Sequence, residues 1–453
     1  MKIIVWFVAL LFITTNVVAS GKNPKWTEAE KKILADSVRQ EFLYAWNSYK
    51  QYAWGHDQLK PLSKSYKDWY GTSLCMTPVD ALDAMLLMGL KAEADSTREY
   101  IAKNLSFYKD IYVKTFELTT RILGGLLSGY ELTGDRRLLD LAQEGGSRLL
   151  PSFSSPTGMP HVWVNLKTGA VLGDSSNPAE FGTLLVEFGT LTKYTDENIF
   201  YGKAKQALTE IYKRRSPIGL VGEKINVMTG QWIDTTSHIG GMIDSYYEYL
   251  LKCSILFDDK DCAEMWRNSI AAVNKYLSHS AANGFWYSHV DMNTGRRIGT
   301  NFGALDAFFP AVLALSGDLD RAKQLEESCY KMWTKFGIEP EELDYSTMKI
   351  TKPGYPLRPE IIESAYYLYH YTHDDRYLEM GRTFFRSLVK YCRTDAGYAA
   401  LKNVETKEKK DEMDSFFLAE TLKYLYLLFA PAETLDFDKI IFSTEAHPIK
   451  KNN

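Results

Sequence analysis

The sequence predicts an all-α fold in which helical hairpins close into a ring. Helical periodicity dominates the chain, and strand-like alternation is scarce. Short turns that carry aspartate recur about every sixty residues, and each turn separates an apolar helix from an amphipathic one. Because a helix that is apolar all round is buried, whereas an amphipathic helix covers a surface, this alternation indicates an inner and an outer layer.

The composition is that of a globular protein with a large core. The chain has 453 residues, of which 45% are hydrophobic and 24% are charged, and its formal net charge is −4. No basic stripe occurs along the chain, so nucleic acid is not an expected partner. The sequence also lacks a Gly-rich phosphate loop and a strand–turn serine elbow, which excludes nucleotide-binding proteins and serine hydrolases. His56, His238 and His447 do not have the spacing of zinc ligands.

Residues 1–20 have the pattern of a secretory signal peptide. Lys2 gives a positive start, Ile3 to Ile13 form an apolar run, and small residues follow before residue 21. The run is shorter than a membrane span requires, and no later segment is apolar enough to cross a bilayer. We expect export to the periplasm or medium in a bacterium, or to the lumen of the secretory pathway in a eukaryote. No Pro/Gly/Ser-rich linker divides residues 21–453, which predicts a single domain.

The aspartate-bearing turns define the repeat. They are Gly134–Arg137, Thr195–Asn198, Asp258–Asp261, Gly317–Asp320 and His373–Arg376. An aspartate in such a turn is expected to cap the helix that follows it. The chain before the first turn and after the last has room for further units, which predicts roughly seven hairpins. Closing them into a toroid would cover the two end repeats.

The five cysteines do not form a disulfide framework. Cys253 and Cys262 are close in sequence, and they either pair or stay free. We expect Cys75, Cys329 and Cys392 to be buried free thiols.

Acidic residues recur inside segments that are otherwise apolar or aromatic and are predicted to be helical. They are Glu117 within 113–127, Asp244 and Glu248 within 238–251, Glu360 and Glu363 within 355–369, and Glu420 within 415–429. A buried carboxylate without a partner is unfavourable, so these acids belong either to buried ion pairs or to one shared pocket. In a closed ring the inner helices converge on a central cavity, which favours the pocket of a glycosidase or a cation site.

Seven segments, taken together, resemble a known family. They are AWGHDQLKP at 53–61, TPVDALDAMLLMGL at 77–90, FELTTRILGGLLSGY at 116–130, GGMIDSYYEYLLK at 240–252, RPEIIES at 358–364, SFFLAETLKYLYLLF at 415–429 and FSTEAHP at 442–448. This ordered set is similar to the class I α-mannosidases, glycoside hydrolase family 47, over nearly the whole mature chain. The resemblance implies an (α/α)7 barrel that removes terminal α-1,2-linked mannose from high-mannose N-glycans with inversion, using a bound Ca2+.

The resemblance also implies the catalytic carboxyls. The general acid falls at Glu117, where apolar neighbours favour the protonated form, while Arg121 one helical turn away favours the ionised form. The base falls at Glu360 or at Asp244, and the sequence does not decide between them. An inverting reaction needs the working carboxyls about 6.5–9.5 Å apart. Glu341 matches another pocket acid of the family, with a solvated acidic loop as the alternative.

The remaining site residues follow from the same resemblance. Thr444 matches the residue that offers its carbonyl and hydroxyl oxygens to Ca2+, with carboxylates acting through the water shell of the ion. The residues implied for substrate binding and for the lining of the pocket are Arg358, Phe416, Glu187, Glu248, Glu363 and Glu420. An ordinary capping or ion-pair role is the alternative for Glu187, and a core position is the alternative for Phe416.

Details of the pattern narrow the branch of the family. A disulfide of the Golgi-type members would need a second cysteine for Cys329, and Ala307 stands in its place. The chain instead looks closest to the EDEM-like branch, whose members trim mannose from glycoproteins destined for degradation. We expect a monomer that acts on a high-mannose oligosaccharide or glycoprotein. The alternatives are a lectin-like protein that binds mannose glycans with weak or no turnover, and another helical-toroid enzyme such as a lyase or epimerase.

Overall fold

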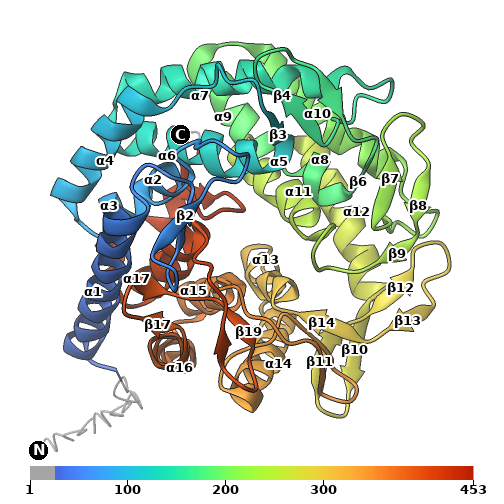
Figure 1. The fold of residues 1–453 in the computed structure, drawn as a ribbon. Helices are drawn as coiled ribbons and strands as arrows, with labels where there is room; N and C mark the ends of the chain where they lie inside the picture. Colours follow the sequence, from blue (N-terminus) through green and yellow to red (C-terminus); the bar gives the residue numbers. More distant parts are fainter. Residues whose placement is uncertain (1–25, 452–453) are drawn as a thin grey trace, which may run out of the picture.

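The computed structural model describes residues 26–451, and their helices form a closed ring (Figure 1). Within this range seven pairs of packed helices can be followed around the ring. They are α3 (Leu82–Leu87) with α4 (Lys91–Asn104), α6 (Gly124–Thr133) with α7 (Arg136–Leu149), α9 (Leu185–Thr195) with α10 (Asn198–Lys213), α11 (Asp244–Leu256) with α12 (Lys260–Tyr276), α13 (Phe309–Leu315) with α14 (Leu319–Phe336), α15 (Glu360–Thr372) with α16 (Asp375–Tyr391), and α17 (Leu422–Phe429) with α1 (Glu28–Tyr52). The last pair joins the two ends of the described chain and closes the ring. The predicted all-α toroid is therefore confirmed.

The two predicted layers are also present. The inner helix α11 is buried continuously from Ser245 to Cys253, because neighbours surround it. The outer helix α16 buries one face, with Leu378, Phe385 and Leu388 among its buried residues, and exposes the other. This difference matches the apolar and amphipathic patterns of the two segments.

Tight turns join six of the inner helices to their outer partners, and the aspartates of these turns mostly have the predicted role. Asp135, Asp259, Asp318 and Asp374 are N-caps whose carboxylates accept backbone N–H groups of α7, α12, α14 and α16. The prediction is wrong for Asp196. This residue ends α9 in a left-handed conformation with φ 59°, and the following helix has Glu197 as its N-cap, without a side-chain cap. A short polar side chain tolerates this conformation better than most residues.

Small antiparallel sheets lie in the connections from the outer helices to the next inner helices, and one further hairpin follows the inner helix α17. None of their strands exceeds four residues in the described chain. The sheets are β1 (Gln58–Lys60) with β2 (Ser65–Lys67); β3 (Tyr112–Lys114), β4 (Trp163–Asn165) and β5 (Val171–Leu172); β6 (Ser175–Ser176), β7 (Lys224–Asn226) and β8 (Trp232–Asp234); β9 (Thr236–Ser237), β12 (His289–Asp291) and β13 (Arg297–Gly299); β10 (Ser278–Ala281) with β11 (Gly284–Tyr287); β14 (Asn301–Gly303), β15 (Glu342–Asp344) and β16 (Lys349–Lys352); β17 (Arg393–Thr394) with β18 (Gly397–Tyr398); β19 (Leu401–Asn403) with β20 (Glu408–Lys409); and β21 (Ile440–Phe442) with β22 (Pro448–Lys450). Strands of this length show too few alternations to be recognised in the sequence.

Short helical segments complete the fold. They are α2 (Met76–Asp80), α5 (Thr115–Glu117), α8 (Pro178–Gly182), the π-helical η1 (Leu118–Leu123) and η4 (Phe417–Thr421), and the 3₁₀ turns η2 (Leu150–Ser154), η3 (Leu305–Phe308), η5 (Ala432–Thr434) and η6 (Phe437–Lys439).

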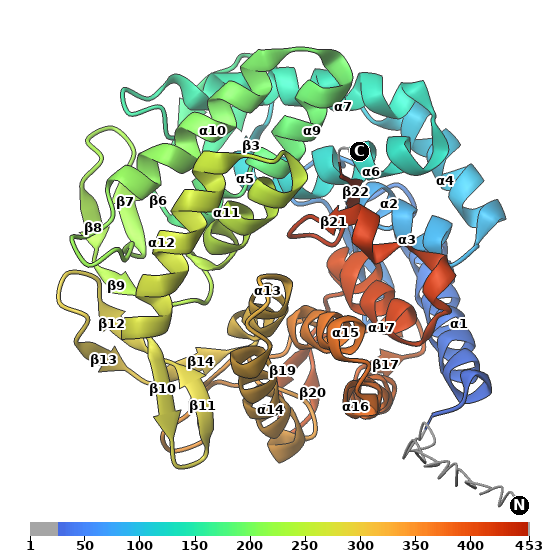
Figure 2. The same ribbon diagram turned by 180° about the vertical axis from the view of Figure 1, so that it is seen from behind.

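The hairpin β21–β22 enters the ring from one end, as Figure 2 shows from behind. Its strands are almost entirely buried, and Phe442 packs against the rings of Tyr366 and Tyr424 from the inner helices. The connection between its strands, residues 443–447, therefore lies on the axis of the ring. We call this connection the hairpin turn.

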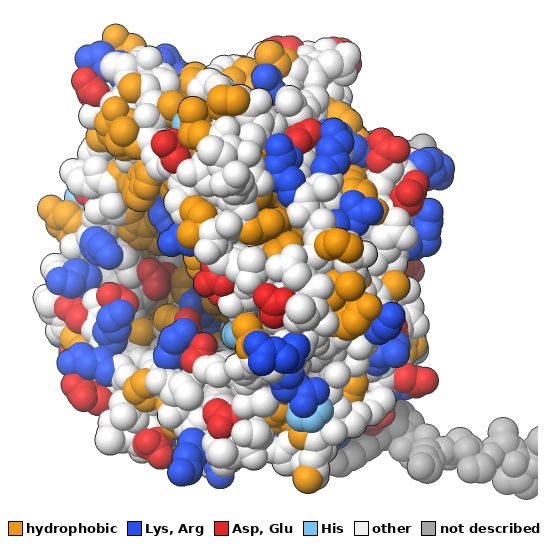
Figure 3. Space-filling view, turned by 90° about the vertical axis from the view of Figure 1, so that its right-hand side faces the viewer, with side chains coloured by type: hydrophobic (Ala, Val, Ile, Leu, Met, Phe, Trp, Pro, Cys, Tyr) orange, Lys and Arg blue, Asp and Glu red, His pale blue; other side chains and the backbone are white. Residues whose placement is uncertain are grey.

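Several further predictions can be compared with residues 26–451. All five cysteines are buried and free, so Cys253 and Cys262 are not bonded, and the prediction of free thiols at the other three is confirmed. Among these residues no helix has the length and apolar character that a membrane span requires. The predicted signal peptide, residues 1–20, lies outside the described residues. Figure 3 shows acidic and basic side chains interspersed over one side of the molecule.

Candidate active site

A cavity of about 410 Å³ lies within the ring, between the inner helices and the hairpin turn. Most of the acids singled out in the sequence meet here. Nine of the predicted site residues line the cavity: Glu117, Asp244, Glu248, Arg358, Glu360, Glu363, Phe416, Glu420 and Thr444. The repeat therefore does bring carboxyls from distant parts of the chain into one pocket.

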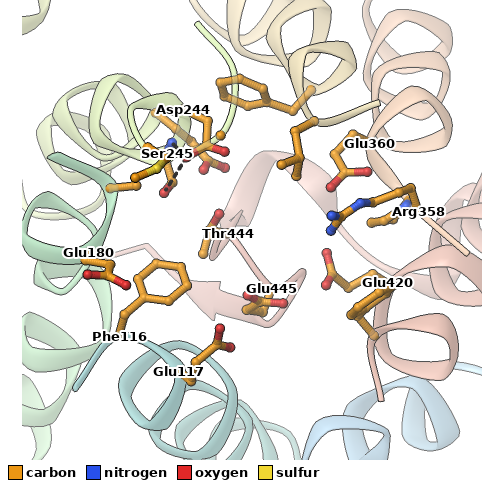
Figure 4. A pocket seen from close by; sticks show the side chains of 18 of the residues that line it. Phe116, Glu117, Glu180, Asp244, Ser245, Arg358, Glu360, Glu420, Thr444 and Glu445 are labelled. Carbon is orange, nitrogen blue, oxygen red and sulfur yellow. Dashed lines mark hydrogen bonds between the residues drawn. The ribbon is translucent and has the colours of Figure 1, made fainter. Parts of the chain in front are cut away.

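The ends of the inner helices position these side chains. Asp244 is the first residue of α11 and Glu360 is the first residue of α15. Figure 4 shows Glu117 across the cavity from Asp244 and Glu360, with Thr444 between them. The N-terminus of a helix favours an ionised carboxylate, so both acids have backbone dipoles that support a negative charge.

Two π-helical segments border the cavity, which the sequence did not indicate. The segment η1 begins directly after Glu117, and η4 carries Glu420. A π-turn is wider than an α-turn and is frequent at functional sites. The residues of both segments have the same apolar, helix-like spacing as an α-helix, so the sequence does not reveal the π-turns.

The guanidinium of Arg121 is shared among four carboxyls. Its Nε donates to Glu117 Oε2 at 2.9 Å, and its Nη1 donates to Glu445. The same Nη1 lies 3.6 Å from Asp80 Oδ2 and 3.9 Å from Glu420 Oε1. The positive charge of Arg121 therefore faces several carboxyls, and its ion pair with Glu117 is not exclusive.

Phe416 lines the cavity close to two guanidinium groups. The guanidinium carbons of Arg121 and Arg358 lie 5.5 Å and 5.8 Å from its ring centroid. Cation–π attraction to both groups favours this orientation of the ring. A ring held in this way presents an apolar surface to a ligand, so Phe416 is more than core filling.

Glu341 was expected in the pocket, and the structure corrects this prediction. Its carboxylate forms a bidentate pair with Arg358, with Glu341 Oε1 2.7 Å from Nη2 and Oε2 3.2 Å from Nε. Glu341 precedes β15 and borders a second cavity of about 390 Å³, whereas Arg358 lines the first. The carboxylate thus lies behind the guanidinium and acts on the pocket through it.

Burial changes the proton affinity of the two candidate bases. It raises the pKa of Glu360 to about 8, although the charge of Arg358 opposes the shift. It raises the pKa of Asp244 to about 7, against the hydrogen bond that the backbone N–H of Ser245 donates to Asp244. Glu360 Oε2 is buried and has no hydrogen-bond partner in the described part of the chain. This oxygen is free to accept a proton.

Behind two of the cavity acids lies a buried cation that the sequence did not indicate. Lys252, 1% exposed, forms an ion pair with Glu248 one helical turn earlier and lies 4.0 Å from Glu363 Oε1. Tyr424 donates to the same Glu363 oxygen at 3.2 Å. Both explanations of the acids in apolar segments therefore apply. These acids line a shared pocket, and some of them form buried ion pairs.

Glu187 was expected among the pocket residues, and the structure places it underneath. It is fully buried and does not line the cavity. Tyr249 donates to Glu187 Oε1 at 2.6 Å, and the backbone N–H of Thr444 donates to the Tyr249 hydroxyl at 3.2 Å. Glu187 therefore supports Thr444 through Tyr249 and does not contact the cavity itself.

Comparison with known proteins decides the family. The model of glycosyl hydrolase family 47 matches residues 41–451. The chain belongs to this family.

Relatives and solved structures agree with this assignment. The chain is 36% identical to Alpha-mannosidase I MNS5 of Arabidopsis thaliana, with 98% of this chain and 81% of that protein covered. It is 37% identical to ER degradation-enhancing alpha-mannosidase-like protein 2 of Homo sapiens, covering 91% of this chain and 77% of the other. The alpha-1,2-mannosidase from Trichoderma reesei superposes with a TM-score of 0.86 at 26% identity, over 93% of this chain and 99% of that one. A cellobiose 2-epimerase from Bacillus thermoamylovorans gives a TM-score of 0.58 at 10% identity, over 88% of this chain and 99% of that one, which is a likeness of fold alone.

The surroundings of Thr444 in this family 47 chain suit an oxygen-liganded cation. Among residues 26–451, no group of three or more His, Cys, Asp or Glu side chains is placed to bind a metal directly. Thr444 nevertheless shares the cavity with Glu248, Glu363, Glu420 and Glu445. Ca2+ accepts hydroxyl, carbonyl and water oxygens, so carboxylates at a greater distance can hold it through water. The donor set fits Ca2+.

Other cavity residues of this family 47 enzyme were missed in the sequence. Glu445 adjoins Thr444 in the hairpin turn. In the sequence, its position next to a predicted Ca2+ ligand was the one feature that could have indicated its place in the cavity. Asn177, Glu180 and Met242 line the cavity from segments without a marked pattern. Met242 has a left-handed backbone with φ 80° and is 36% exposed. A non-glycine residue rarely adopts this conformation, which sequence reasoning does not anticipate.

Proposed function

We propose that this family 47 glycoside hydrolase is a Ca2+-dependent, inverting exo-α-1,2-mannosidase that trims terminal mannose from high-mannose N-glycans. The observation that carries the proposal is the position of Glu117 across one cavity from Glu360 and Asp244, with Thr444 between them. Relatives named mannosyl-oligosaccharide 1,2-alpha-mannosidase, such as MNS1 of Arabidopsis thaliana at 35% identity, support this choice of substrate.

The shape of the cavity supports cleavage at the end of a glycan. The hairpin β21–β22 enters the ring from one end (Figure 2), and its turn contributes Thr444 and Glu445 to the lining of the cavity. We infer that the glycan enters from the opposite end, so that the mannose in the cavity is terminal. The volume of about 410 Å³ lies toward the small end of the usual range for ligand sites.

Glu117 is the general acid of the proposed reaction. It gives its proton to the glycosidic oxygen while the bond between that oxygen and the anomeric carbon breaks. Arg121 orients the Glu117 carboxyl through the 2.9 Å contact. The same guanidinium also contacts Glu445 and lies near Asp80 and Glu420.

Glu360 is the general base. In its ionised form the Glu360 carboxylate accepts a proton from a water molecule, whose oxygen attacks the anomeric carbon from the face opposite the leaving group. The product is β-mannose, and the two carboxyls then return to their starting protonation states through solvent. Asp244, on the neighbouring wall, orients this water.

Thr444 would hold the cation, and Glu248, Glu363, Glu420 and Glu445 would act on it through water. When bound, Ca2+ would supply a positive charge that orients sugar hydroxyls and favours ionised carboxylates around it. Arg358 and Phe416 hold the sugar from the side by hydrogen bonding and by ring contact. Glu341 fixes Arg358, and Glu187 fixes the turn through Tyr249.

We infer that residues 21–453 act as one catalytic domain after removal of the signal peptide, and that the enzyme works in the secretory route as a monomer. Detection of the mature N-terminus in secreted or lumenal material by mass spectrometry tests the export, and sedimentation tests the monomer. An N-terminus that begins at residue 1 would contradict the cleavage.

The decisive experiment follows the first sugar that Man9GlcNAc2 releases. Proton NMR should show β-mannose first, because inversion converts the α-linkage, and a chelator should abolish release. Added Ca2+ should restore it. Initial α-mannose would refute inversion, activity untouched by chelation would refute the cation at Thr444, and binding of the glycan without release would favour the lectin-like alternative.

A further inference from the structure

The hairpin turn carries two cavity residues, Thr444 and Glu445, and something must hold it in place. Its own hydrogen bonds are few: Ser443 N–H donates to His447 O at 2.9 Å, Ala446 N–H donates to Ser443 O at 3.1 Å, and His447 N–H donates to Ser443 Oγ at 3.2 Å. Ala446 has a left-handed backbone with φ 57°, an unfavourable conformation for alanine. A turn of this kind keeps one geometry only when its surroundings impose it.

His447, the last residue of the turn, provides a buried attachment. Its imidazole has no exposed surface, with Nδ1 2.7 Å from Asp83 Oδ2 and Nε2 3.2 Å from Asp80 Oδ1. Asp80 ends α2 and Asp83 lies in α3, so the imidazole joins the turn to two helices from the start of the ring. Burial disfavours a charged imidazole, but the two carboxylates outweigh this effect and raise the pKa of His447 to about 9.

Lys423 completes the cluster from the other end of the chain. Its Nζ lies 2.6 Å from Asp83 Oδ1 and donates to the carbonyl oxygen of Ala446 at 2.7 Å. Lys423 belongs to α17 and is fully buried. Two cations and two carboxylates therefore balance each other beneath the cavity, and one of their hydrogen bonds holds the strained residue of the turn directly.

The paired glycines of the sequence have a physical reason in this cluster. A Cβ atom on Gly124 would lie 2.8 Å from His447 Cδ2. A Cβ atom on Gly125 would lie 3.2 Å from His447 Cε1 and 2.9 Å from Val79 Cγ1. The imidazole thus packs flat against the backbone of α6, and only glycine leaves room for it at Gly124.

We propose that His447 is a positioning residue: clamped by Asp80, Asp83 and the glycine pair, it holds Thr444 and Glu445 in the geometry that binds the cation. Because Glu445 in turn contacts Arg121, the same clamp orients the Glu117 carboxyl. This inference rests on the proposed function, since it concerns the proposed Ca2+ site.

The test compares His447→Gln with a matched control at the other end of the same hairpin. Glu131 accepts the backbone N–H of Lys450 at 2.6 Å, so Glu131→Gln also loosens the hairpin but does so far from the turn. Metal-free wild type and both variants are titrated with CaCl2 by isothermal calorimetry, and their thermal unfolding is recorded with and without Ca2+. We expect His447→Gln to weaken Ca2+ binding at least about tenfold, or 1.4 kcal/mol, and to lose most of the Ca2+-induced rise in Tm. Glu131→Gln should keep the affinity within about threefold, even if its Tm falls.

The outcomes separate the two proposals. If wild type does not bind Ca2+, the proposed function fails at its cation site. If wild type binds Ca2+ and folded His447→Gln binds equally well, the positioning role is refuted. Should His447→Gln not fold, Asp80→Asn retains the shape of the clamp and removes one charge. Wild-type affinity in folded Asp80→Asn then overturns the proposal, and weakened affinity supports it.

Discussion

At the scale of single residues, Arg121 shows how one guanidinium can contact several carboxyls at once. Its guanidinium contacts Glu117, Glu445 and the aromatic ring of Phe416, and lies near two further carboxyls. The spacing of Glu117 and Arg121 in the sequence predicted their contact. The sequence did not predict that Asp80, Glu420 and Glu445 also lie near Arg121, because only the closure of the ring brings them there.

The assignment of acid and base predicts different responses to one change of substrate. Glu117→Gln should lower the rate on a mannose disaccharide by about 10²–10⁴-fold. It should retain much of the rate on α-mannosyl fluoride, because fluoride leaves without protonation. Glu360→Gln should lose both activities, since attack by water needs the base with either leaving group.

The measurement is kcat/KM on the two substrates, with folding checked by circular dichroism. Equal losses of both activities in Glu117→Gln would argue against its role as acid. If Asp244→Asn loses both activities while Glu360→Gln keeps the fluoride reaction, the base is Asp244.

At the scale of elements, the sequence predicted helices and their order well, and predicted turns less completely. Aspartates in the repeating turns identified four helix starts, because an N-cap is a local interaction. The prediction of an N-cap at Asp196 was wrong because aspartate is also suited to the left-handed conformation at the end of a helix. The π-helical turns and the short strands were not predicted, since neither alters apolar periodicity over enough residues.

The two kinds of aspartate should respond in opposite ways to substitution. Asp374→Ala removes the cap bond to the N–H of Arg376 at 2.9 Å and should cost about 1 kcal/mol of stability. Asp196→Gly should be neutral or slightly stabilising, because glycine adopts positive φ without strain. Urea unfolding of the two variants in parallel measures both effects. A destabilised Asp196→Gly would show that the Asp196 side chain has a role that its backbone conformation does not explain.

At the scale of the whole molecule, many buried acids have a pKa that is raised mainly by burial, some of them in the pocket and others outside its lining. The values are about 8 for Glu187, Glu360 and Glu363, about 7 for Asp244, and about 6 for Asp306 and Asp414. Once a ring was assumed, the sequence predicted that acids would converge in a pocket. The sequence did not predict which of these acids line the cavity, because Glu187 and Glu341 differ from the others only in three-dimensional packing.

These shifts predict an unusual dependence of stability on pH. A group whose pKa is higher in the folded than in the unfolded state stabilises the fold below its ordinary pKa, and this stabilisation is lost as the pH rises through about 6 to 8. The Tm in the presence of a chelator should therefore fall by at least about 3 °C between pH 5 and pH 8. Added Ca2+ should reduce the fall by favouring the ionised carboxylates.

A remote carboxyl provides the matched variant. Both oxygens of Glu326 are buried without a hydrogen-bond partner in the described chain, and burial raises its pKa. Glu326→Gln cannot ionise, so its Tm should fall less steeply with pH than that of wild type. A Tm that is constant or rises from pH 5 to pH 8 in the chelated wild type would contradict the account.

The contact between Arg121 and Glu445 joins residues 324 positions apart and has a consequence for biosynthesis. At roughly 5–20 residues per second, a ribosome needs on the order of 15–65 s to reach the second partner after making the first. Throughout that interval Arg121 lacks Glu445, and Asp80 and Asp83 lack His447. A nascent or prematurely terminated chain can contain Glu117, Asp244 and Glu360 and still be inactive. The time at which the hairpin β21–β22 inserts into the ring therefore decides when the enzyme first becomes active.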